Sequence, residues 1–216
     1  YSLIHDDLPC MDDDDLRRGQ PTNHKVYGEA TAVLAGDALL TAAFEVMLDG
    51  KSTLPAERVL EAAGLLARAS GGQGMVGGQI LDMAGEGHSL GIHEVEELQR
   101  LKTGALIAAA AEMGCVLAGG SEEQRKAVVQ YARQLGLAFQ VQDDILDVTG
   151  DASTLGNPTG SDARSEKSTF VTLRGLEMCR ELVKELTQGA IEALASFGAE
   201  GDELRWLANT LACREK

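Results

Sequence analysis

The chain has 216 residues, with 34 acidic and 19 basic side chains and a formal net charge of -15. This excess of negative charge argues against nucleic acid or an anionic membrane surface as a partner. Four scattered cysteines lack the spacing of a zinc site or a disulfide framework, which favours a reducing, cytoplasmic location. No apolar run approaches the ~20 residues of a membrane span, so we expect no stable insertion into a membrane.

Apolar residues recur with the period of an α-helix along nearly the whole chain, and the alternating pattern of strands is absent from the sequence. In chain order the predicted helices cover residues 27–49, 56–69, 73–83, 92–117, 121–148, 168–197 with a break near Gly175, and 200–213. Glycines inside these helices predict close approaches between helices, and they are Gly36, Gly104, Gly114 and Gly136. The sequence thus predicts a single all-α domain over residues 1–216.

An acidic cluster, DDLPCMDDDD at residues 6–15, precedes the first long helix. So many like charges close together cost free energy unless a cation neutralises them. Arg17 and Arg18 follow directly, and guanidinium groups match phosphate oxygens. Taken alone, the cluster would be a solvated surface neutralised by these two arginines. The sequence contains no glycine-rich phosphate loop of the G-x-x-x-x-G-K-[ST] type.

A second acidic cluster lies inside an apolar helical pattern that begins at Ser121, where Gln124 completes a predicted capping box. Its polar stripe, spaced i, i+3, i+4 and i+7, consists of Gln140, Asp143, Asp144 and Asp147. A solvated face is the weaker interpretation here, because nearly every neighbouring residue is apolar. Carboxylate oxygens suit Mg²⁺, which bridges carboxylates to substrate phosphates. Together the two clusters predict a multi-metal site for a phosphate-bearing ligand.

Six sequence blocks resemble, in the same order, those of the trans-prenyltransferases that make short-chain isoprenyl diphosphates. They are DDLPCMDDDDLRRG, PTNHKVYGEATAVLAGDALL, GGQILD, LKTGALI, GLAFQVQDDILDVTGD and EKSTFV. The resemblance implies the isoprenoid synthase fold, in which mostly antiparallel helices surround a central active-site cavity, and it implies a homodimer. It also implies condensation of isopentenyl diphosphate with an allylic diphosphate, either dimethylallyl or geranyl diphosphate.

The resemblance also assigns roles to single residues. It implies roughly three Mg²⁺ ions per active site, with the ligands Asp6, Asp7, Asp12, Asp143 and Asp147. The predicted catalytic residues are Asp6, Asp7, Asp12, Arg17, Lys102, Thr103, Gln140, Asp143, Asp144 and Lys167. The predicted substrate-binding residues are Arg17, Arg18, Lys102, Thr103, Gln140, Asn157 and Lys167.

Within these sets the expected tasks differ. Arg17, Lys102 and Lys167 match positions that hold the allylic diphosphate, and Arg18 matches one that holds isopentenyl diphosphate. Thr103 and Gln140 match residues whose oxygens face the carbocation, and Asp144 is expected to orient metal-bound water. Without the resemblance, Lys102 would be an ordinary surface lysine, and Gln79 and Asp82 an exposed i, i+3 pair.

Tyr1, with Ser2 beside it, is the predicted chain-length position. It lies five residues before Asp6, or ~7.5 Å along a helix axis, where a bulky side chain would close a tunnel for the growing product. An aromatic residue there, with two extra residues inside the first aspartate motif, resembles bacterial farnesyl diphosphate synthases. We therefore expect a fifteen-carbon product, with a twenty-carbon geranylgeranyl product as the alternative. Ordinary core packing of Tyr1 is equally open.

Two departures from the family pattern stand out. Nothing matches the upstream GGKRxRP-like segment that binds isopentenyl diphosphate, so we expect an N-terminally incomplete domain that alone condenses its substrates poorly. Asn157 stands where the family has lysine, and it can hydrogen-bond a phosphate but carries no charge. Two other classes stay open, a non-catalytic partner subunit of a prenyl synthase and an ionisation-initiated terpene cyclase. The paired Arg17 and Arg18 favour the two-substrate condensation.

Overall fold

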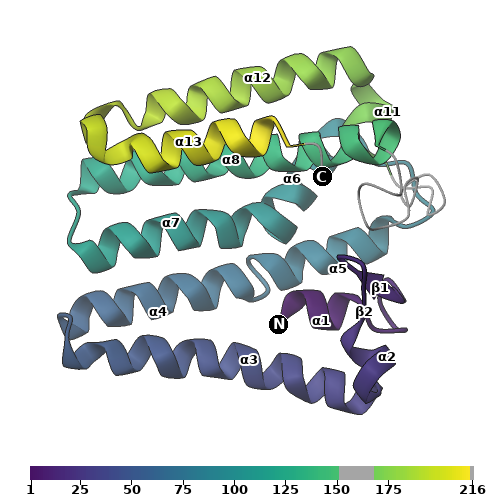
Figure 1. Ribbon diagram of the computed structural model, residues 1–216, viewed down its shortest axis with the longest axis horizontal. Coiled ribbons are helices and arrows are strands. Elements are labelled where there is room, and N and C mark those ends of the chain that lie inside the picture. The colour runs from purple at the N-terminus through teal and green to yellow at the C-terminus, as the bar shows by residue number, and fades with distance from the viewer. Residues whose placement is uncertain (151–167, 215–216) are drawn as a thin grey trace.

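The computed structural model describes residues 1–150 and 168–214, and its architecture is a helical bundle. The first half contains α1 (Ser2–Asp6), β1 (Leu16–Arg17), β2 (Gln20–Pro21), α2 (Asn23–Tyr27), α3 (Glu29–Asp49), η1 (Gly50–Ser52), α4 (Ala56–Ser70) and α5 (Met75–Gly85). The second half contains α6 (Ile92–Gln99), η2 (Arg100–Gly104), α7 (Ala105–Ala118), α8 (Glu122–Thr149), α11 (Phe170–Arg174), α12 (Leu176–Ala193), η3 (Ala195–Gly201) and α13 (Asp202–Ala212). The long helices lie side by side and successive ones run in opposite directions (Figure 1). The predicted all-α fold is confirmed.

The observed helix bounds follow the predicted ones closely, with three differences. The predicted helix at 92–117 is interrupted by η2, a π-helical turn over Arg100–Gly104. The helix predicted from Tyr27 begins instead at Glu29, because Gly28 adopts a φ of 85° and separates α2 from α3. The expectation of no strand is also wrong in one place, since β1 and β2 pair as a short antiparallel hairpin.

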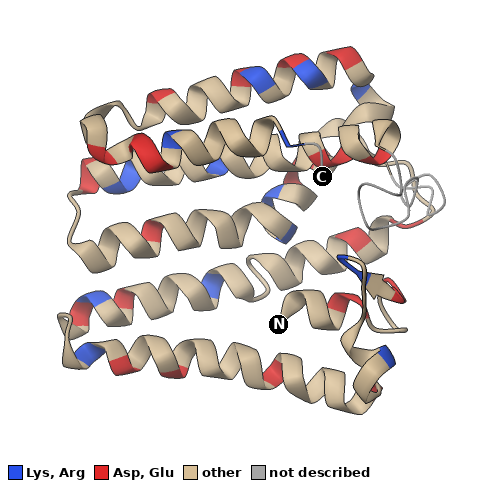
Figure 2. Cartoon of the chain, in the orientation of Figure 1, with Lys and Arg blue, Asp and Glu red and all other residues tan. Residues whose placement is uncertain are grey.

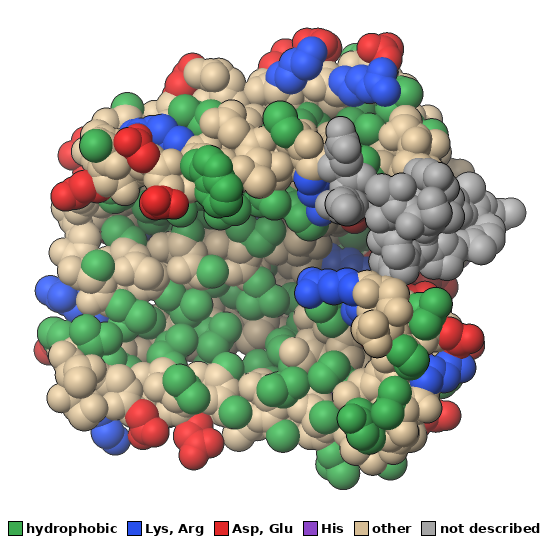
Figure 3. Space-filling view, in the orientation of Figure 1, with side chains coloured by type: hydrophobic (Ala, Val, Ile, Leu, Met, Phe, Trp, Pro, Cys, Tyr) green, Lys and Arg blue, Asp and Glu red, His purple; other side chains and the backbone are tan. Residues whose placement is uncertain are grey.

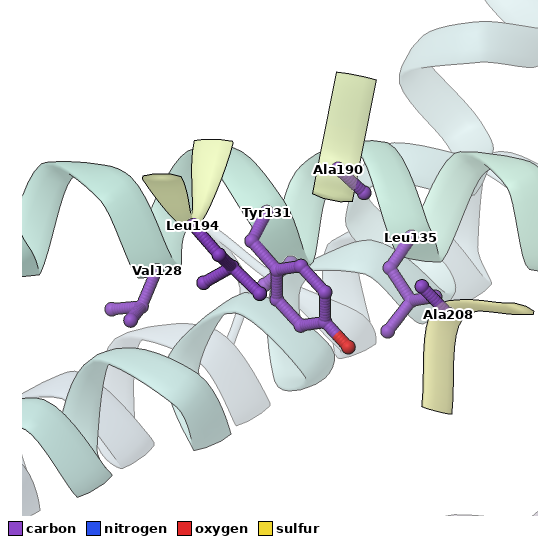
Figure 4. Packing of buried hydrophobic residues seen from close by; sticks show 7 residues of the cluster. Val128, Tyr131, Leu135, Ala190, Leu194 and Ala208 are labelled. Atoms are coloured by element: carbon purple, nitrogen blue, oxygen red, sulfur yellow. The ribbon is translucent and has the colours of Figure 1, made fainter. Parts of the chain in front are cut away.

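Helix α8 is the centre of the larger core cluster. Its start is the predicted capping box, in which the Ser121 hydroxyl accepts from the Gln124 amide. Apolar side chains of α8 then pack against α12, α13 and the segment between them, and the buried members are Val128, Tyr131, Ala132, Leu135, Ala190, Leu194 and Ala208 (Figure 4). The Tyr131 hydroxyl donates to the Leu204 carbonyl at 2.7 Å, and burial raises the pKa of Tyr131 to about 12. This core fixes α8, which carries the second acidic cluster.

The helical glycines do not all serve the same purpose. Gly36 of α3 faces His5 of α1, and an added Cβ would lie 2.7 Å from His5 Cε1. Gly136 of α8 faces η2, where an added Cβ would lie 3.4 Å from the Cα of Gly104. Gly114, however, has nothing within 4 Å of an added Cβ. The prediction of a close helix approach is therefore wrong for Gly114.

Helix α3 leaves much of its apolar surface exposed. Leu34 is 66% exposed and Val46 is 74% exposed, and hydrophobic side chains are visible along this helix in Figure 3. By length and composition alone, Glu29–Ser52 and Ile92–Ala118 could each cross a membrane. The prediction that no apolar run approaches that length is wrong on this measure, which tolerates two charged residues such as Asp37 and Glu45 of α3.

Candidate active site

The first acidic cluster lies between α1 and a hairpin that places two arginines beside it. Asp6 ends α1 and Asp7 is the capping residue that follows. The hairpin pairs Arg17 with Gln20. Its two loop residues, Arg18 and Gly19, both have positive φ, at 53° and 74°, as in the tight turns that match strand twist. The hairpin thus presents successive arginines differently, with Arg17 half-buried and Arg18 exposed.

Arg17 is the direct partner of Asp7. Its Nε and Nη2 atoms both lie 2.6 Å from Oδ1 of Asp7, whose side chain is only 4% exposed. The same Nη2 reaches Asp14 at 3.5 Å. In this structure Asp7 therefore binds a guanidinium, and its role as a metal ligand stays a prediction.

Asp6 faces α5 instead. Gln79 of α5 donates a hydrogen bond to the Asp6 carboxylate. Burial raises the pKa of Asp6, against the opposing charge of Lys102, and the nearby Asp12 charge raises it further. A carboxylate that is desolvated and close to another carboxylate is a strong candidate for cation binding. Asp12 itself is exposed, so it is open to an incoming cation.

Helix α5 contributes two site residues, which without the family resemblance would have been placed on an exposed surface. The first is Gln79. The second is Asp82, which accepts a hydrogen bond from Lys102 Nζ at 2.6 Å; the Asp82 side chain is 13% exposed and that of Lys102 is 22% exposed. The alternative that would have applied without the resemblance, an exposed i, i+3 pair of Gln79 and Asp82, is therefore wrong. Their spacing does place both on one face of α5, but the partner of that face was not visible in the sequence.

In the second cluster, the four residues of the polar stripe have different surroundings. Asp144 is 7% exposed and accepts from the backbone N–H of Phe170 at 2.7 Å. Asp143 is exposed and pairs with Arg214 at 2.7 Å, while the Arg214 guanidinium also lies 3.8 Å from the Phe139 ring centroid. Asp147 and Gln140 are half-buried. Asp144 thus occupies a separate environment from Asp143, and its expected role in orienting metal-bound water stays a prediction.

The two clusters occupy the same end of the bundle. Acidic segments at the end of α1, on α5 and on α8 gather at the right of Figure 2. Asp82 and Asp144 line one cavity of about 40 Å³ between α5, α6 and α8. Among residues 1–150 and 168–214, no group of three or more His, Cys, Asp or Glu is placed to hold one ion. The carboxylates are held instead by Arg17, Gln79 and Arg214, and their all-oxygen donor set suits Mg²⁺.

Tyr1 precedes α1, at the opposite end of that helix from Asp7 and its hairpin contact, and is held by two neighbours. Its hydroxyl donates to the Ser70 carbonyl at 3.2 Å, at the end of α4. Its ring meets the His5 ring edge-on, with centroids 6.1 Å apart. Burial raises the pKa of the Tyr1 phenol. Tyr1 and Ser2 are both half-buried. The contact with Ser70 places the Tyr1 side chain between α1 and the end of α4.

The remaining predicted residues divide into two groups. Thr103 is half-buried within η2, one residue after Lys102. Asn157 and Lys167 lie outside the described residues. Arg214 was not foreseen, because a cation near the chain end gives no sequence signal of its contact with Asp143, 71 positions earlier.

The helical bundle with two acidic motifs at one end defines a class, the all-α isoprenoid synthase fold. Within it, the chain belongs to the polyprenyl synthetase family, whose model matches residues 1–200. The predicted family is confirmed.

Relatives with different names resemble the chain about equally. Farnesyl diphosphate synthase of Geobacillus stearothermophilus is 43% identical over 217 residues, which cover 100% of this chain and 73% of the relative. Geranylgeranyl pyrophosphate synthase 3, chloroplastic, of Arabidopsis thaliana is 49% identical over 218 residues, covering 99% of this chain and 61% of the relative. The chain thus spans about three fifths of the length of that plant relative.

A solved structure is also similar. The geranyltransferase of Helicobacter pylori, complexed with magnesium and isoprenyl diphosphate, has a TM-score of 0.84 and 40% identity, covering 98% of this chain and 69% of that one.

Proposed function

We propose that the protein is a prenyltransferase that condenses isopentenyl diphosphate with dimethylallyl or geranyl diphosphate. The observation that carries the proposal is that both aspartate motifs lie at the same end of the bundle, with Arg17 bound to Asp7 and the charge of Lys102 acting on Asp6. In the reaction the allylic C–O bond breaks and diphosphate leaves with the electron pair. The double bond of isopentenyl diphosphate then attacks the carbocation, and a proton is lost.

Mg²⁺ would be held by Asp6, Asp7, Asp12, Asp143 and Asp147, and when bound it neutralises the departing diphosphate. The chain's own cations complement this role. Arg17, Lys102 and Lys167 would bind the allylic diphosphate, and Arg18 and Asn157 would add contacts to diphosphate oxygens. Lys102 is already ordered by Asp82, so its ammonium is positioned before a substrate arrives.

Thr103 and Gln140 would stabilise the carbocation with oxygen dipoles. Both are half-buried, and fixed dipoles in a desolvated site need no reorganisation as charge develops. Asp144 would act as a positioning residue, since its carboxylate accepts from the Phe170 amide and thereby ties α8 to α11.

The product is proposed to be farnesyl diphosphate, with geranylgeranyl diphosphate as the alternative because relatives of both names resemble the chain. The ring of Tyr1, fixed by Ser70 and His5, supports the shorter product. The test is chain-length analysis after incubation of the protein, as its complete gene encodes it, with Mg²⁺, isopentenyl diphosphate and geranyl diphosphate. We expect Tyr1→Ala to shift products from fifteen to twenty carbons and Tyr1→Phe to keep fifteen. Fifteen-carbon product from Tyr1→Ala would refute the role of the ring.

A homodimer is proposed as the working form, in the cytoplasm. The supporting observation is the exposed apolar surface of α3, where Leu34 and Val46 are largely open to solvent. Exposed apolar side chains along one helix are typical of an interaction surface. Light scattering that gave a monomer, or a complex formed only with a second synthase, would instead favour the partner-subunit alternative.

A further inference from the structure

The π-helical turn η2 carries two residues of the proposed site, Lys102 and Thr103. Single π turns inside a helix occur often at functional sites, because they displace the backbone from the regular helical path. Such a turn is rare and interrupts the regular hydrogen-bond pattern of the helices on either side. Its position therefore depends on what packs around it.

Two glycines contact this turn from opposite helices. Gly78 of α5 is buried against it, and an added Cβ would lie 2.5 Å from Lys102 Cα and 2.8 Å from the carbonyl carbon of Leu101. Gly136 of α8 faces it from the other helix, with 3.4 Å from an added Cβ to Gly104 Cα. Real Cβ atoms do not approach backbone as closely as the Gly78 position would require. Only glycine at 78 allows α5 and η2 to lie this close.

The neighbours of Gly78 on α5 connect the same contact to the first acidic cluster. Gln79, the next residue, donates to Asp6. Asp82, one helical turn after Gly78, holds the Lys102 ammonium at 2.6 Å. One face of α5 therefore touches the backbone of the turn, its lysine and the acidic cluster together.

We propose that Gly78 is a positioning residue, which sets the location of Lys102 and Thr103 relative to Asp6 by letting α5 pack directly on the backbone of η2. The expected effect of Gly78 on turnover rests on the proposed function, whereas its effect on the position of η2 does not. A methyl group at position 78 separates α5 from η2, and a displacement of about 1 Å in such a site lowers turnover on the order of 100-fold.

The test uses three glycine-to-alanine variants of the protein as its complete gene encodes it. Gly78→Ala adds a methyl group against backbone, Gly136→Ala adds one at the limit of ordinary contact, and Gly114→Ala, the matched control, adds one in open space. Three measurements are made on each variant: hydrogen exchange of the amides at 100–104, the rate of chemical acetylation of Lys102, and kcat and KM for condensation.

We expect Gly78→Ala to speed exchange and Lys102 acetylation at least tenfold and to lower kcat on the order of 100-fold, more than it raises KM. Gly136→Ala should show the same changes in smaller measure, and it carries the test if Gly78→Ala does not fold. Gly114→Ala should leave all three measurements unchanged. Exchange and acetylation that are the same in Gly78→Ala as in Gly114→Ala would overturn the inference. A wild-type protein without condensation activity would refute the proposed function alone, because exchange and acetylation still decide the role of Gly78.

Discussion

The pair formed by Arg17 and Asp7 offers a quantitative test of how the first acidic cluster is held. Two guanidinium nitrogens lie 2.6 Å from one oxygen of a carboxylate that is 4% exposed, and Arg17 itself is 27% exposed. At an effective dielectric constant of about 20, charges ~4 Å apart attract by ~4 kcal/mol. Removing one partner of a buried pair typically costs about 3–5 kcal/mol. Since Arg17 is partly solvated, we expect Arg17→Met to lower the free energy of unfolding by about 3 kcal/mol.

The assay is urea unfolding without divalent metal, arranged as a double-mutant cycle. Asp7→Asn removes the charge that Arg17→Met would leave unpaired, so the double variant should be more stable than Arg17→Met alone. The expected coupling free energy is about 2 kcal/mol. Arg180→Met is the matched control, because its ion pair with Glu177 is largely exposed and should contribute less than about 0.5 kcal/mol.

Two outcomes would refute this reasoning. A cost below about 1 kcal/mol for Arg17→Met would show that the pair behaves as an exposed one. A coupling near zero would show that Arg17 stabilises the hairpin through packing alone, with Asp7 neutralised by some other group.

Three further predictions concern stability. The Tyr131 phenol has a pKa of 10.0 when free and about 12 in the folded protein, so the unfolded chain loses its proton first as pH rises from 10 to 12. The free energy of unfolding of the wild type should therefore fall by about 2 kcal/mol over this range. Tyr131→Phe should abolish this fall, and an alkaline profile that is the same in both proteins would contradict the prediction. Gly36→Ala should cost about 1–3 kcal/mol by displacing His5, whereas an effect as small as that of Gly114→Ala would be inconsistent with the observed contact. Mg²⁺ with diphosphate at 100 times the dissociation constant should stabilise the protein by about 2.7 kcal/mol, and EDTA should reverse this in a thermal melt; a melt indifferent to both would argue against the metal site.

Most of the fold followed from local patterns in the sequence. The capping box at Ser121 marked the start of α8 to the residue, because a cap is a contact between residues three positions apart. The hairpin at residues 16–21 was not foreseen, since strands of two residues leave no alternating pattern. The π turn at residues 100–104 was missed for a related reason, because five residues are fewer than the window in which helical periodicity can be read.

The site was predictable where its residues cluster in sequence and not where they meet only in space. Both aspartate motifs were visible as charge runs, and the second conflicts with the apolar pattern that surrounds it. Without the family resemblance, Gln79 and Asp82 would have been read as an exposed pair, because their partners Asp6 and Lys102 lie 73 and 20 positions away. Arg214 is a similar case at the other end of the chain. Long-range polar contacts of this kind have no periodic signal.

The most direct test of the central claim is Mg²⁺-dependent condensation by the protein as its complete gene encodes it. Labelled isopentenyl diphosphate is incubated with geranyl diphosphate and Mg²⁺, with wild type, Asp6→Asn and Asp147→Asn compared, one variant from each aspartate motif. We predict an elongated allylic diphosphate from the wild type, none in EDTA, and a fall in kcat of about 100-fold or more for each variant. No elongation with any allylic acceptor, or elongation that persists in EDTA, would contradict the account.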